Sequence, residues 1–541
     1  MPMTIKDLLG KIPYSAELYQ LARPGRPRTR YNLAQLQGAL PTAVAQARGF
    51  AIKAPTDRRI VLFATLHYWV EQAVIIGLTL RGLGHDVSVA YLPYGDWRKE
   101  INAFDLRRQD LYTHRVLTPL NGLVKTVSLL DVAPAQRLPA ALEKAIETVS
   151  AYDAMYTNQE ENVDRKSGLY RLRLKRNRFA ALAAISFLQA TRPDVVLIPN
   201  GTITELGAVY QVARHLGIDT VTYEFNDQRE QIWIAQNDEV MRQNTDLLWS
   251  ARGGQPLNNS QREKIEALEA ARMGGRAFGK STRQWQDVAA IGGAQLRAEL
   301  GLDERPVILL ATNVLGDSLT LGRNIFASSM AEWITRTVQF FATRSNVQLL
   351  IRVHPGERLT HGLSMVDVIN AALPAPGVPA HIHVIKPLEK INTYDLMELA
   401  NLGLVYTTTT GMEMCMNGIP VMACGETHYR KRGFTIDPQS WDEYFTSLER
   451  ILPDLAAQHL TAKQVDTAWE YAYRFFFEYP LSFPWRLMHF WKDLALWPVE
   501  RILSDAGRAE FGPAFDYLAA KAPLWEAENP PATSSDQRKT P

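Results

Sequence analysis

Short apolar runs alternate with helical patterns along this chain, and they gather in two separate regions. In the first region the runs of strand length lie at 60–64, 86–91, 193–199 and 220–224. In the second region the alternation is denser, with runs at 306–311, 347–353, 381–385, 403–406 and 419–423. Strands that alternate with helices are typical of parallel sheets, because each parallel strand needs a crossover connection. The pattern therefore predicts an α/β protein with two Rossmann-like parallel-sheet domains.

The same pattern divides the chain into five segments. Residues 1–56 are expected to form a helical, basic N-terminal extension, and residues 57–284 an N-terminal Rossmann-like domain with a helical insertion. Residues 285–456 are expected to form the C-terminal Rossmann-like domain. Residues 457–528 are rich in aromatic side chains, and we expect C-terminal helices that pack back on the N-terminal domain. The polar tail at 529–541 is rich in proline and is predicted to be disordered.

Two helical stretches have an unusual composition. We interpret the basic run from Arg165 to Arg178 as a solvated helix face joined to a linker, the usual role of a charge run. The aromatic segment from Phe475 to Leu496 has two interpretations. Core packing is the one we expect, and peripheral association with a membrane interface is the alternative.

The overall composition is that of a globular protein in a reducing compartment. With 541 residues the chain exceeds what one hydrophobic core organises. Its 59 Lys and Arg nearly balance 57 Asp and Glu, so no bulk positive charge attracts nucleic acid. The two cysteines, Cys415 and Cys424, have no metal-ligand spacing and give no disulfide scaffold. Without a signal peptide or a run of 18 apolar residues, we expect a cytoplasmic protein that meets a membrane, if at all, at its inner face.

One phosphate-loop pattern is present and is set aside. Gly274–Ser281 satisfies GxxxxGK[ST], and Lys280 would be its phosphate-binding lysine. A working loop of this kind follows a buried strand, so that backbone amides converge on the phosphates at the start of a helix. The preceding residues 261–273 have a helical pattern instead, and no strand ending in Asp is placed to hold magnesium.

Polar residues follow the second strand of the C-terminal region. The sequence there is Arg352-Val353-His354-Pro355, and the proline ends the strand and fixes the turn that presents the imidazole. Ligands of open α/β sheets bind at this edge. A histidine there can donate to a phosphate oxygen or to a leaving group, and Arg352 can balance its charge; a structural strand end is the alternative.

A second polar block follows a later strand. Residues 407–410 are four threonines, followed by Gly411 at the start of a helix and by Glu413 in its first turn. The hydroxyls and free amides can cradle a phosphate, and the carboxylate can accept hydrogen bonds from ribose hydroxyls. A threonine cap with a glutamate near the positive end of the helix dipole is the alternative. Together with the His354-Pro355 block, this pattern favours a binding site.

These blocks carry a resemblance to a known family. The segment Asn392–Pro438 resembles the C-terminal half of bacterial capsule polysaccharide biosynthesis proteins, Kdo-transferase-like enzymes of the GT-B glycosyltransferase fold. The His-Pro element also occurs in enzymes that use cytidine-nucleotide donors. The resemblance implies a GT-B-like fold in which the two Rossmann-like domains face a central cleft, residues 285–456 bind a nucleotide-sugar and residues 57–284 bind the acceptor. The donor-binding residues it implies are His354, Thr408, Thr409, Thr410 and Glu413; with them we place Arg352, Pro355, Gly411 and Arg323.

A GT-B enzyme takes its catalytic base from the N-terminal domain, at loops that follow the strands. His67 follows the first strand, and a neutral imidazole there can deprotonate an acceptor hydroxyl near pH 7. Glu224 and Asp227 follow a later strand and are alternative bases, and Glu205 on a helix face is a further one. No DxD pair follows an N-terminal strand, so we expect no metal and no cofactor.

The resulting hypothesis is a metal-independent glycosyltransferase that acts in surface-polysaccharide assembly. Its expected partners are a nucleotide-sugar donor, with a cytidine nucleotide as one option, and a carbohydrate or glycolipid acceptor. A nucleotide-sugar epimerase and a glycerophosphotransferase of related fold stay open as alternatives. A non-catalytic scaffold protein of a polysaccharide assembly machine is the alternative from another class.

Overall fold

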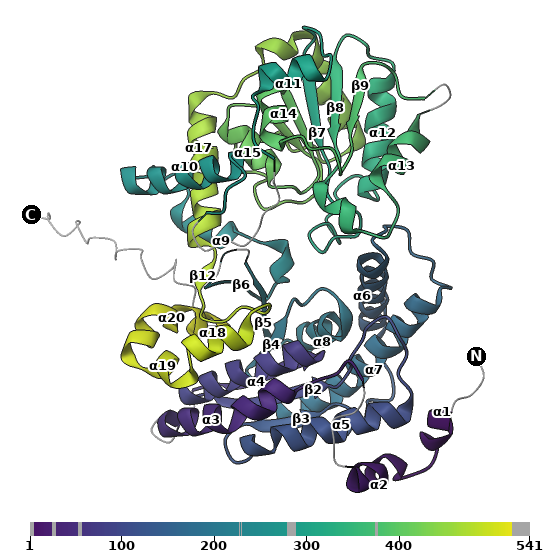
Figure 1. Cartoon of the computed structure of the whole chain (residues 1–541), viewed down its shortest axis with the longest axis vertical. Helices are drawn as coiled ribbons and strands as arrows, with labels where there is room; N and C mark the ends of the chain where they lie inside the picture. Colours follow the sequence, from purple (N-terminus) through teal and green to yellow (C-terminus); the bar gives the residue numbers. More distant parts are fainter. Residues whose placement is uncertain are drawn as a thin grey trace, which may run out of the picture.

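The computed structural model describes residues 5–23, 29–51, 57–226, 228, 230–278, 288–373 and 377–521. Two α/β domains lie one above the other along the longest axis (Figure 1). Each has its own sheet, with strand order β12-β6-β5-β4-β1-β2-β3 in the N-terminal domain and β11-β10-β7-β8-β9 in the C-terminal domain. The predicted fold class, an α/β protein with two Rossmann-like domains, is therefore confirmed.

The N-terminal sheet is parallel over five strands and antiparallel at one edge. Its strands are β1 (Arg59–Thr65), β2 (Asp86–Leu92), β3 (Lys125–Ser128), β4 (Val195–Pro199), β5 (Asp219–Phe225), β6 (Gln231–Gln236) and β12 (Leu481–Ser482). Strand β6 pairs antiparallel with both of its neighbours, β5 and β12, and all other pairs in this sheet are parallel. The helices of this domain are α3 (Ala34–Ala51), α4 (His67–Gly82), α5 (Ala103–Leu117), α6 (Ala140–Asn158), α7 (Gly168–Thr191) and α8 (Thr204–His215). Sequence patterning misses the two edge strands, β3 and β12, which are short, and also β6, which lies between β5 and β12.

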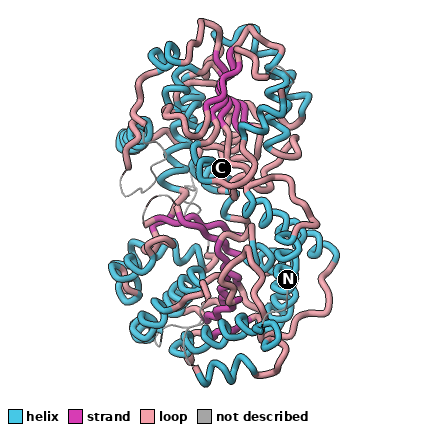
Figure 2. The backbone as a smooth tube through the Cα atoms, turned by 45° about the vertical axis from the view of Figure 1, so that its right-hand side comes forward, coloured by secondary structure: helices cyan, strands magenta, loops and turns pink. Residues whose placement is uncertain are grey.

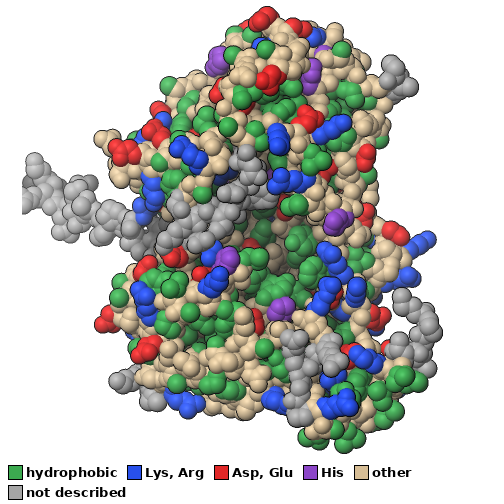
Figure 3. All heavy atoms as spheres, viewed as in Figure 1, with side chains coloured by type: hydrophobic (Ala, Val, Ile, Leu, Met, Phe, Trp, Pro, Cys, Tyr) green, Lys and Arg blue, Asp and Glu red, His purple; other side chains and the backbone are tan. Residues whose placement is uncertain are grey.

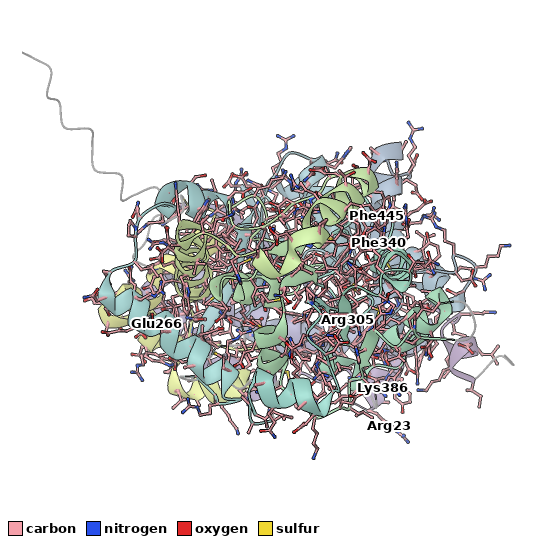
Figure 4. The ribbon with its side chains drawn as sticks, turned by 90° about the horizontal axis from the view of Figure 1, so that it is seen from above. Arg23, Glu266, Arg305, Phe340, Lys386 and Phe445 are labelled. Carbon is pink, nitrogen blue, oxygen red and sulfur yellow. The ribbon has the colours of Figure 1, made fainter. Side chains whose placement is uncertain are left out.

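The C-terminal sheet is parallel throughout and matches the predicted strands closely. Its strands are β7 (Val307–Ala311), β8 (Gln348–Arg352), β9 (Ile382–Ile385), β10 (Leu402–Val405) and β11 (Val421–Ala423). The helices are α9 (Asp246–Arg252), α10 (Asn259–Met273), α11 (Gly293–Glu299), α12 (Met330–Ala342), α13 (Met365–Ala372), α14 (Thr393–Leu399), α15 (Thr410–Met416), α16 (Trp441–Ile451) and α17 (Ala462–Tyr473). Phe340 on α12 stacks on Phe445 on α16, with ring centroids 5.1 Å apart (Figure 4).

The chain crosses between the two domains before α9 and again after α17. Leu248 on α9 and Leu268 on α10 belong to the apolar core of the C-terminal domain. The boundary expected at 284/285 lies outside the described residues, but the chain has already joined the C-terminal core before it. After α17 the chain returns through β12 to the N-terminal domain, where α18 (Phe490–Leu496), α19 (Val499–Leu503) and α20 (Asp505–Leu518) lie (Figure 1). Phe483 and Trp485 are buried in the core of this domain. Figure 2 shows the strands of the two sheets as separate groups, each with helices around it.

The interpretation of the basic run as a solvated face holds for the exposed residues Arg165, Lys166, Arg171, Lys175 and Arg178, and is wrong for Arg173 and Arg176. Arg173 lies in α7 and is completely buried there. Its guanidinium pairs with Asp153 on α6 at 3.0 Å and with Glu205 on α8 at 3.0 Å. A buried charge is tolerated only when it is paired, and here two carboxylates from neighbouring helices supply the pairing. Arg173 therefore links α7 to α6 and α8, and Glu205 is one of its two carboxylate partners.

The N-terminal extension adds two short helices to the outside of the N-terminal domain. Helices α1 (Ile5–Leu9) and α2 (Ser15–Ala22) lie against α5. The loop expected at residues 24–27 and the tail expected at 529–541 lie outside the described residues. Among the described helices, none combines the length and the apolar character that crossing a bilayer requires.

Candidate functional site

A cavity of about 1290 Å³ lies between the two domains. Its walls come from both sheets' loop ends and from α10, and the space-filling view shows the surface hollowed at this level (Figure 3). The predicted residues that line it are Arg352, His354, Pro355, Thr408, Thr409, Thr410 and Glu413. The structure therefore brings together seven of the nine residues placed on the donor side by sequence.

Three loops of the C-terminal domain form one wall, and hydrogen bonds hold them together. They follow β7, β8 and β10, whose carboxyl ends meet at one edge of the parallel sheet. The amide of His354 donates to Thr312 Oγ1 at 3.0 Å, and the amide of Thr407 donates to Asn313 Oδ1 at 3.1 Å. Thr312 and Asn313, directly after β7, thus fix the positions of both predicted blocks, and sequence reasoning did not single out these two residues.

Arg352 is a buried cation without a carboxylate partner among the described residues. Its Nη atoms donate to the carbonyls of Lys386 and Ile391 at 3.1 and 3.2 Å, and its Nε makes no hydrogen bond to the described residues. Burial lowers the pKa of this guanidinium to about 10, while the Glu389 charge raises it in part. A buried cation that lines a cavity, with no carboxylate at ion-pair distance among the described residues, favours an anionic ligand.

The tautomer of His354 follows from its contacts. The ring Nδ1 accepts a hydrogen bond from the amide of Gly356 at 3.0 Å, because the side chain caps the short 3-10 helix Pro355–Leu359. A neutral ring that accepts at Nδ1 carries its proton on Nε2. His354 can therefore act as a hydrogen-bond donor through Nε2.

The threonine block lies at the start of α15. Thr408 Oγ1 donates to Thr410 Oγ1 at 3.1 Å, and the Thr408 carbonyl accepts from the Tyr429 hydroxyl at 2.7 Å. Gly411 is buried behind this loop and does not line the cavity. A Cβ atom at this position would lie 2.5 Å from the Tyr429 hydroxyl. The glycine is thus required for the close approach of Tyr429, which supports the loop from behind.

Glu413 on α15 faces α10, lines the cavity and is almost completely buried. Arg272 on α10 pairs with its Oε1 at 2.7 Å, and the Tyr394 hydroxyl donates to its Oε2 at 3.2 Å. Burial raises the pKa of Glu413, and the Arg272 charge counteracts this effect. The pKa of the neighbouring Glu269 is raised to about 8 by burial and by the Glu413 charge. Sequence reasoning missed Arg272 and Tyr394, because no pattern connects them to Glu413.

The N-terminal wall consists of aromatic and polar side chains. The described residues on this side include Trp97, Arg98, Tyr156, Asn226 and Trp233. They come from the loop after β2, the end of α6, the loop after β5, and β6. Aromatic faces beside polar groups suit a carbohydrate ring, which presents apolar C–H groups and hydroxyls.

Glu224 does not itself line the cavity, but it lies in β5 directly opposite Trp233 of β6, which does. It lies near the end of β5, two positions before Asn226, where Asn200 donates to its Oε2 at 3.4 Å. Burial raises the pKa of Glu224 to about 7. Burial also raises the pKa of Tyr156, and the charges of Asp317 and Glu224 raise it further, so the carboxyl group acts on a cavity-lining side chain. Asp227 lies outside the described residues.

Two other predicted residues lie away from the cavity lining. His67 begins α4, with its ring against Tyr31 and Tyr68, and burial lowers its pKa. Arg323 is buried between the domains and donates to the Met241 carbonyl. Burial lowers the pKa of Arg323 to about 10, with a further contribution from the Arg242 charge.

The segment that matches a phosphate loop borders the cavity without the geometry of one. The helix α10 precedes it, as predicted, in place of a buried strand. Gly275, Arg276 and Phe278 line the cavity, and Gly279–Ser281 lie outside the described residues.

One group of described residues has the ligand types of a metal site, and it lies outside the cavity lining. Asp110, His114 and Asp131 present oxygen and nitrogen atoms within 4.8 Å of one another. The Arg107 guanidinium already binds both carboxylates, at 2.7 and 2.9 Å. This cation supplies the positive charge that a metal ion would bring.

Comparison with known proteins gives structural neighbours only. No family model and no curated protein matches the chain. A solved β-Kdo 2,4-transferase, KpsC of Thermosulfurimonas dismutans, is 16% identical over 51% of this chain and 78% of its own, with a TM-score of 0.33. The UDP-GlcNAc 2-epimerase of Neisseria meningitidis, bound to UDP-GlcNAc, is 11% identical over 78% of this chain and 100% of its own (TM-score 0.25). The wall teichoic acid polymerase TagF is 9% identical over 96% and 98% (TM-score 0.21). At these values function rests on the site itself.

Proposed function

We propose that this chain is a glycosyltransferase that moves a sugar from a nucleotide-activated donor to a carbohydrate or glycolipid acceptor. Residues 285–456, together with α9 and α10, bind the donor. The rest of residues 57–284 binds the acceptor. The observation that carries the proposal is Arg352, a buried guanidinium in the cavity wall without a carboxylate partner among the described residues. A donor phosphate supplies the missing negative charge.

The other groups of this wall complete a site for a nucleotide phosphate. His354 donates from Nε2, and the hydroxyls of Thr408 and Thr410 lie at the same strand edge. Glu413 accepts from ribose hydroxyls at the rim, with Arg272 and Tyr394 holding its carboxylate in place. Positive charge from Arg352 balances the leaving nucleotide, so the chemistry requires no metal ion.

Glu224 is the group we assign as catalytic base. A pKa of about 7 suits a base that removes the proton of an acceptor hydroxyl near neutral pH. The aromatic wall with Trp97 and Trp233 holds the acceptor ring in place. The resemblance of residues 392–438 to capsule polysaccharide enzymes supports a cytoplasmic role in surface-polysaccharide assembly and a cytidine nucleotide as one candidate donor.

A thermal-shift panel of CMP, CDP, UDP, GDP and ADP tests the donor half of the proposal. A nucleotide that binds the folded chain raises Tm by mass action. Arg352→Met is expected to abolish this rise. Arg305→Met is expected to leave it unchanged, because Arg305 is a half-buried arginine of the same domain that pairs with Asp303 at 2.7 Å and does not line the cavity. The proposal fails if none of the five nucleotides shifts the wild type while ATP with magnesium does.

A further inference from the structure

The N-terminal helices expose large apolar side chains. Among the described residues, sixteen large hydrophobic side chains are exposed, and seven of them fall within residues 5–21. They are Ile5, Leu8, Ile12, Tyr14, Leu18, Tyr19 and Leu21. Single exposed apolar residues are ordinary on a protein surface, but a contiguous group marks a surface that binds something apolar.

The orientation of α2 is the reverse of that of an ordinary surface helix. Gln20 and Ala16 face the protein and are buried, whereas Leu18 is 65% and Leu21 is 77% exposed. A surface helix normally turns its apolar side towards the core. Here the apolar side faces outwards, so burial within the chain does not explain it.

Ion pairs to α5 hold the two helices in this orientation. Lys6 on α1 pairs with Asp105 at 2.7 Å, and Glu17 on α2 pairs with Arg107 at 2.8 Å. The Arg108 guanidinium also lies over the Tyr19 ring, 4.4 Å from its centroid. The polar contacts therefore face the domain, and the apolar side chains are left for an external partner.

Charge indicates the nature of that partner. In the sequence, residues 1–30 contain six Lys and Arg and two Asp and Glu, a net charge of +4. The whole chain carries +2, so residues 31–541 carry −2. The positive charge of the chain is thus concentrated in the sequence segment that carries the exposed apolar residues. In the described part of this segment Lys6 pairs with Asp105 and Arg30 with Asp96, and Arg23 lies at the periphery in Figure 4. Apolar side chains bordered by basic ones match the interface of an anionic bilayer.

We propose that α1 and α2 dock the protein on the surface of a membrane that contains anionic lipids. Leu8, Leu18 and Leu21 enter the acyl boundary, and the basic residues contact the headgroups. The aromatic C-terminal segment does not take this role, because Trp485 and Phe490 are buried in the N-terminal core. This inference is independent of the nucleotide site.

Co-sedimentation of the full chain with vesicles tests the proposal. Vesicles of phosphatidylglycerol and phosphatidylcholine are expected to bind the wild type at least 10-fold more tightly than vesicles of phosphatidylcholine alone, and added salt should weaken the binding. The double variant Leu18→Gln/Leu21→Gln is expected to lose at least 10-fold in affinity. Leu18 and Leu21 are both exposed, so the variant is expected to keep its fold, and circular dichroism checks this.

The matched control removes two exposed apolar side chains elsewhere. Met488→Gln/Leu496→Gln changes residues that are 85% and 65% exposed in the C-terminal aromatic segment. This variant is expected to bind vesicles like the wild type. Loss of binding in the control variant alone, equal loss in both variants, or no binding by the wild type would each overturn the proposal. A wild-type dimer that Leu18→Gln/Leu21→Gln converts to monomers, without vesicle binding, would assign the surface to a second copy.

Discussion

Replacing Glu224 by glutamine is expected to stabilise the protein at high pH while it abolishes sugar transfer. Burial raises the pKa of Glu224 from 4.5 to about 7, so the folded chain holds the proton more tightly than the unfolded chain. The stability that protonation of Glu224 gives the folded chain is therefore complete below about pH 4.5, and it is lost as the pH rises through 7. Above pH 7 the ionised carboxylate opposes folding by about 3 kcal/mol, at roughly 1.4 kcal/mol per pKa unit.

Thermal unfolding at several pH values measures this effect. Glutamine has no charge to desolvate, so Glu224→Gln should raise Tm at pH 8 by about 6 °C, taking ~2 °C per kcal/mol for a domain of this size. At pH 4.5 the two proteins should unfold at nearly the same temperature. Transfer should fall at least 100-fold in the variant, and wild-type activity should rise with pH through about 7, since the base acts in its ionised form.

Glu71 provides the matched control. It is buried on α4, its pKa is also raised to about 7 by burial, and Trp491 donates to its Oε2 at 3.3 Å. Neither Glu71 nor its partner Trp491 lines the cavity, whereas Glu224 lies opposite the lining residue Trp233 in the β5–β6 pair. Glu71→Gln should therefore show the same pH-dependent gain in Tm with normal transfer. Two results would refute the reasoning: transfer that survives in Glu224→Gln, or a loss of transfer that is equal in both variants.

Three further predictions concern the donor wall and the fold. Arg352→Met should weaken the binding of the nucleotide found in the thermal-shift panel at least 100-fold by calorimetry, and a loss under threefold would contradict its role. Glu413→Ala should abolish the nucleotide-dependent rise in Tm and His67→Ala should leave it intact, and equal loss from both would show that the roles are divided wrongly. Arg173→Met should lower the free energy of unfolding by about 3–5 kcal/mol in denaturant titration, because it leaves two carboxylates buried without a cation; a change under 1 kcal/mol would contradict this.

The donor wall could be predicted from the sequence because parallel sheets convert short sequence patterns into spatial neighbours. Each strand of the C-terminal sheet ends at the same edge, so the residues that immediately follow β8 and β10 lie together. Arg352 and the threonine block are about fifty residues apart in sequence, yet the topology alone places both on one wall. The same rule holds for Thr312 and Asn313 after β7, which carry no conspicuous motif.

Residues that act through long-range pairing could not be predicted in this way. Arg173 has the sequence appearance of a solvated helix charge, and only the packing of α6 and α8 brings Asp153 and Glu205 to it. Arg272 similarly lies in an ordinary amphipathic helix, and its ion pair with Glu413 spans 141 positions of sequence. Periodicity indicates which side of a helix is apolar, but it does not indicate which charge meets which.

The acceptor side is difficult to predict for a related physical reason. Its wall combines the end of a long helix, where Tyr156 lies, with the loop after β2, where Trp97 lies, and with a side chain of the antiparallel strand β6. These elements come together through helix packing and antiparallel edge pairing, and neither has a short sequence signature. Strand-end reasoning selected His67 because it follows β1, but the ring lies against Tyr31 and Tyr68, away from the cavity lining. Glu224 follows the same rule at β5 and lies beside a lining residue, because β5 lies nearer the antiparallel edge where β6 contributes Trp233 to the wall.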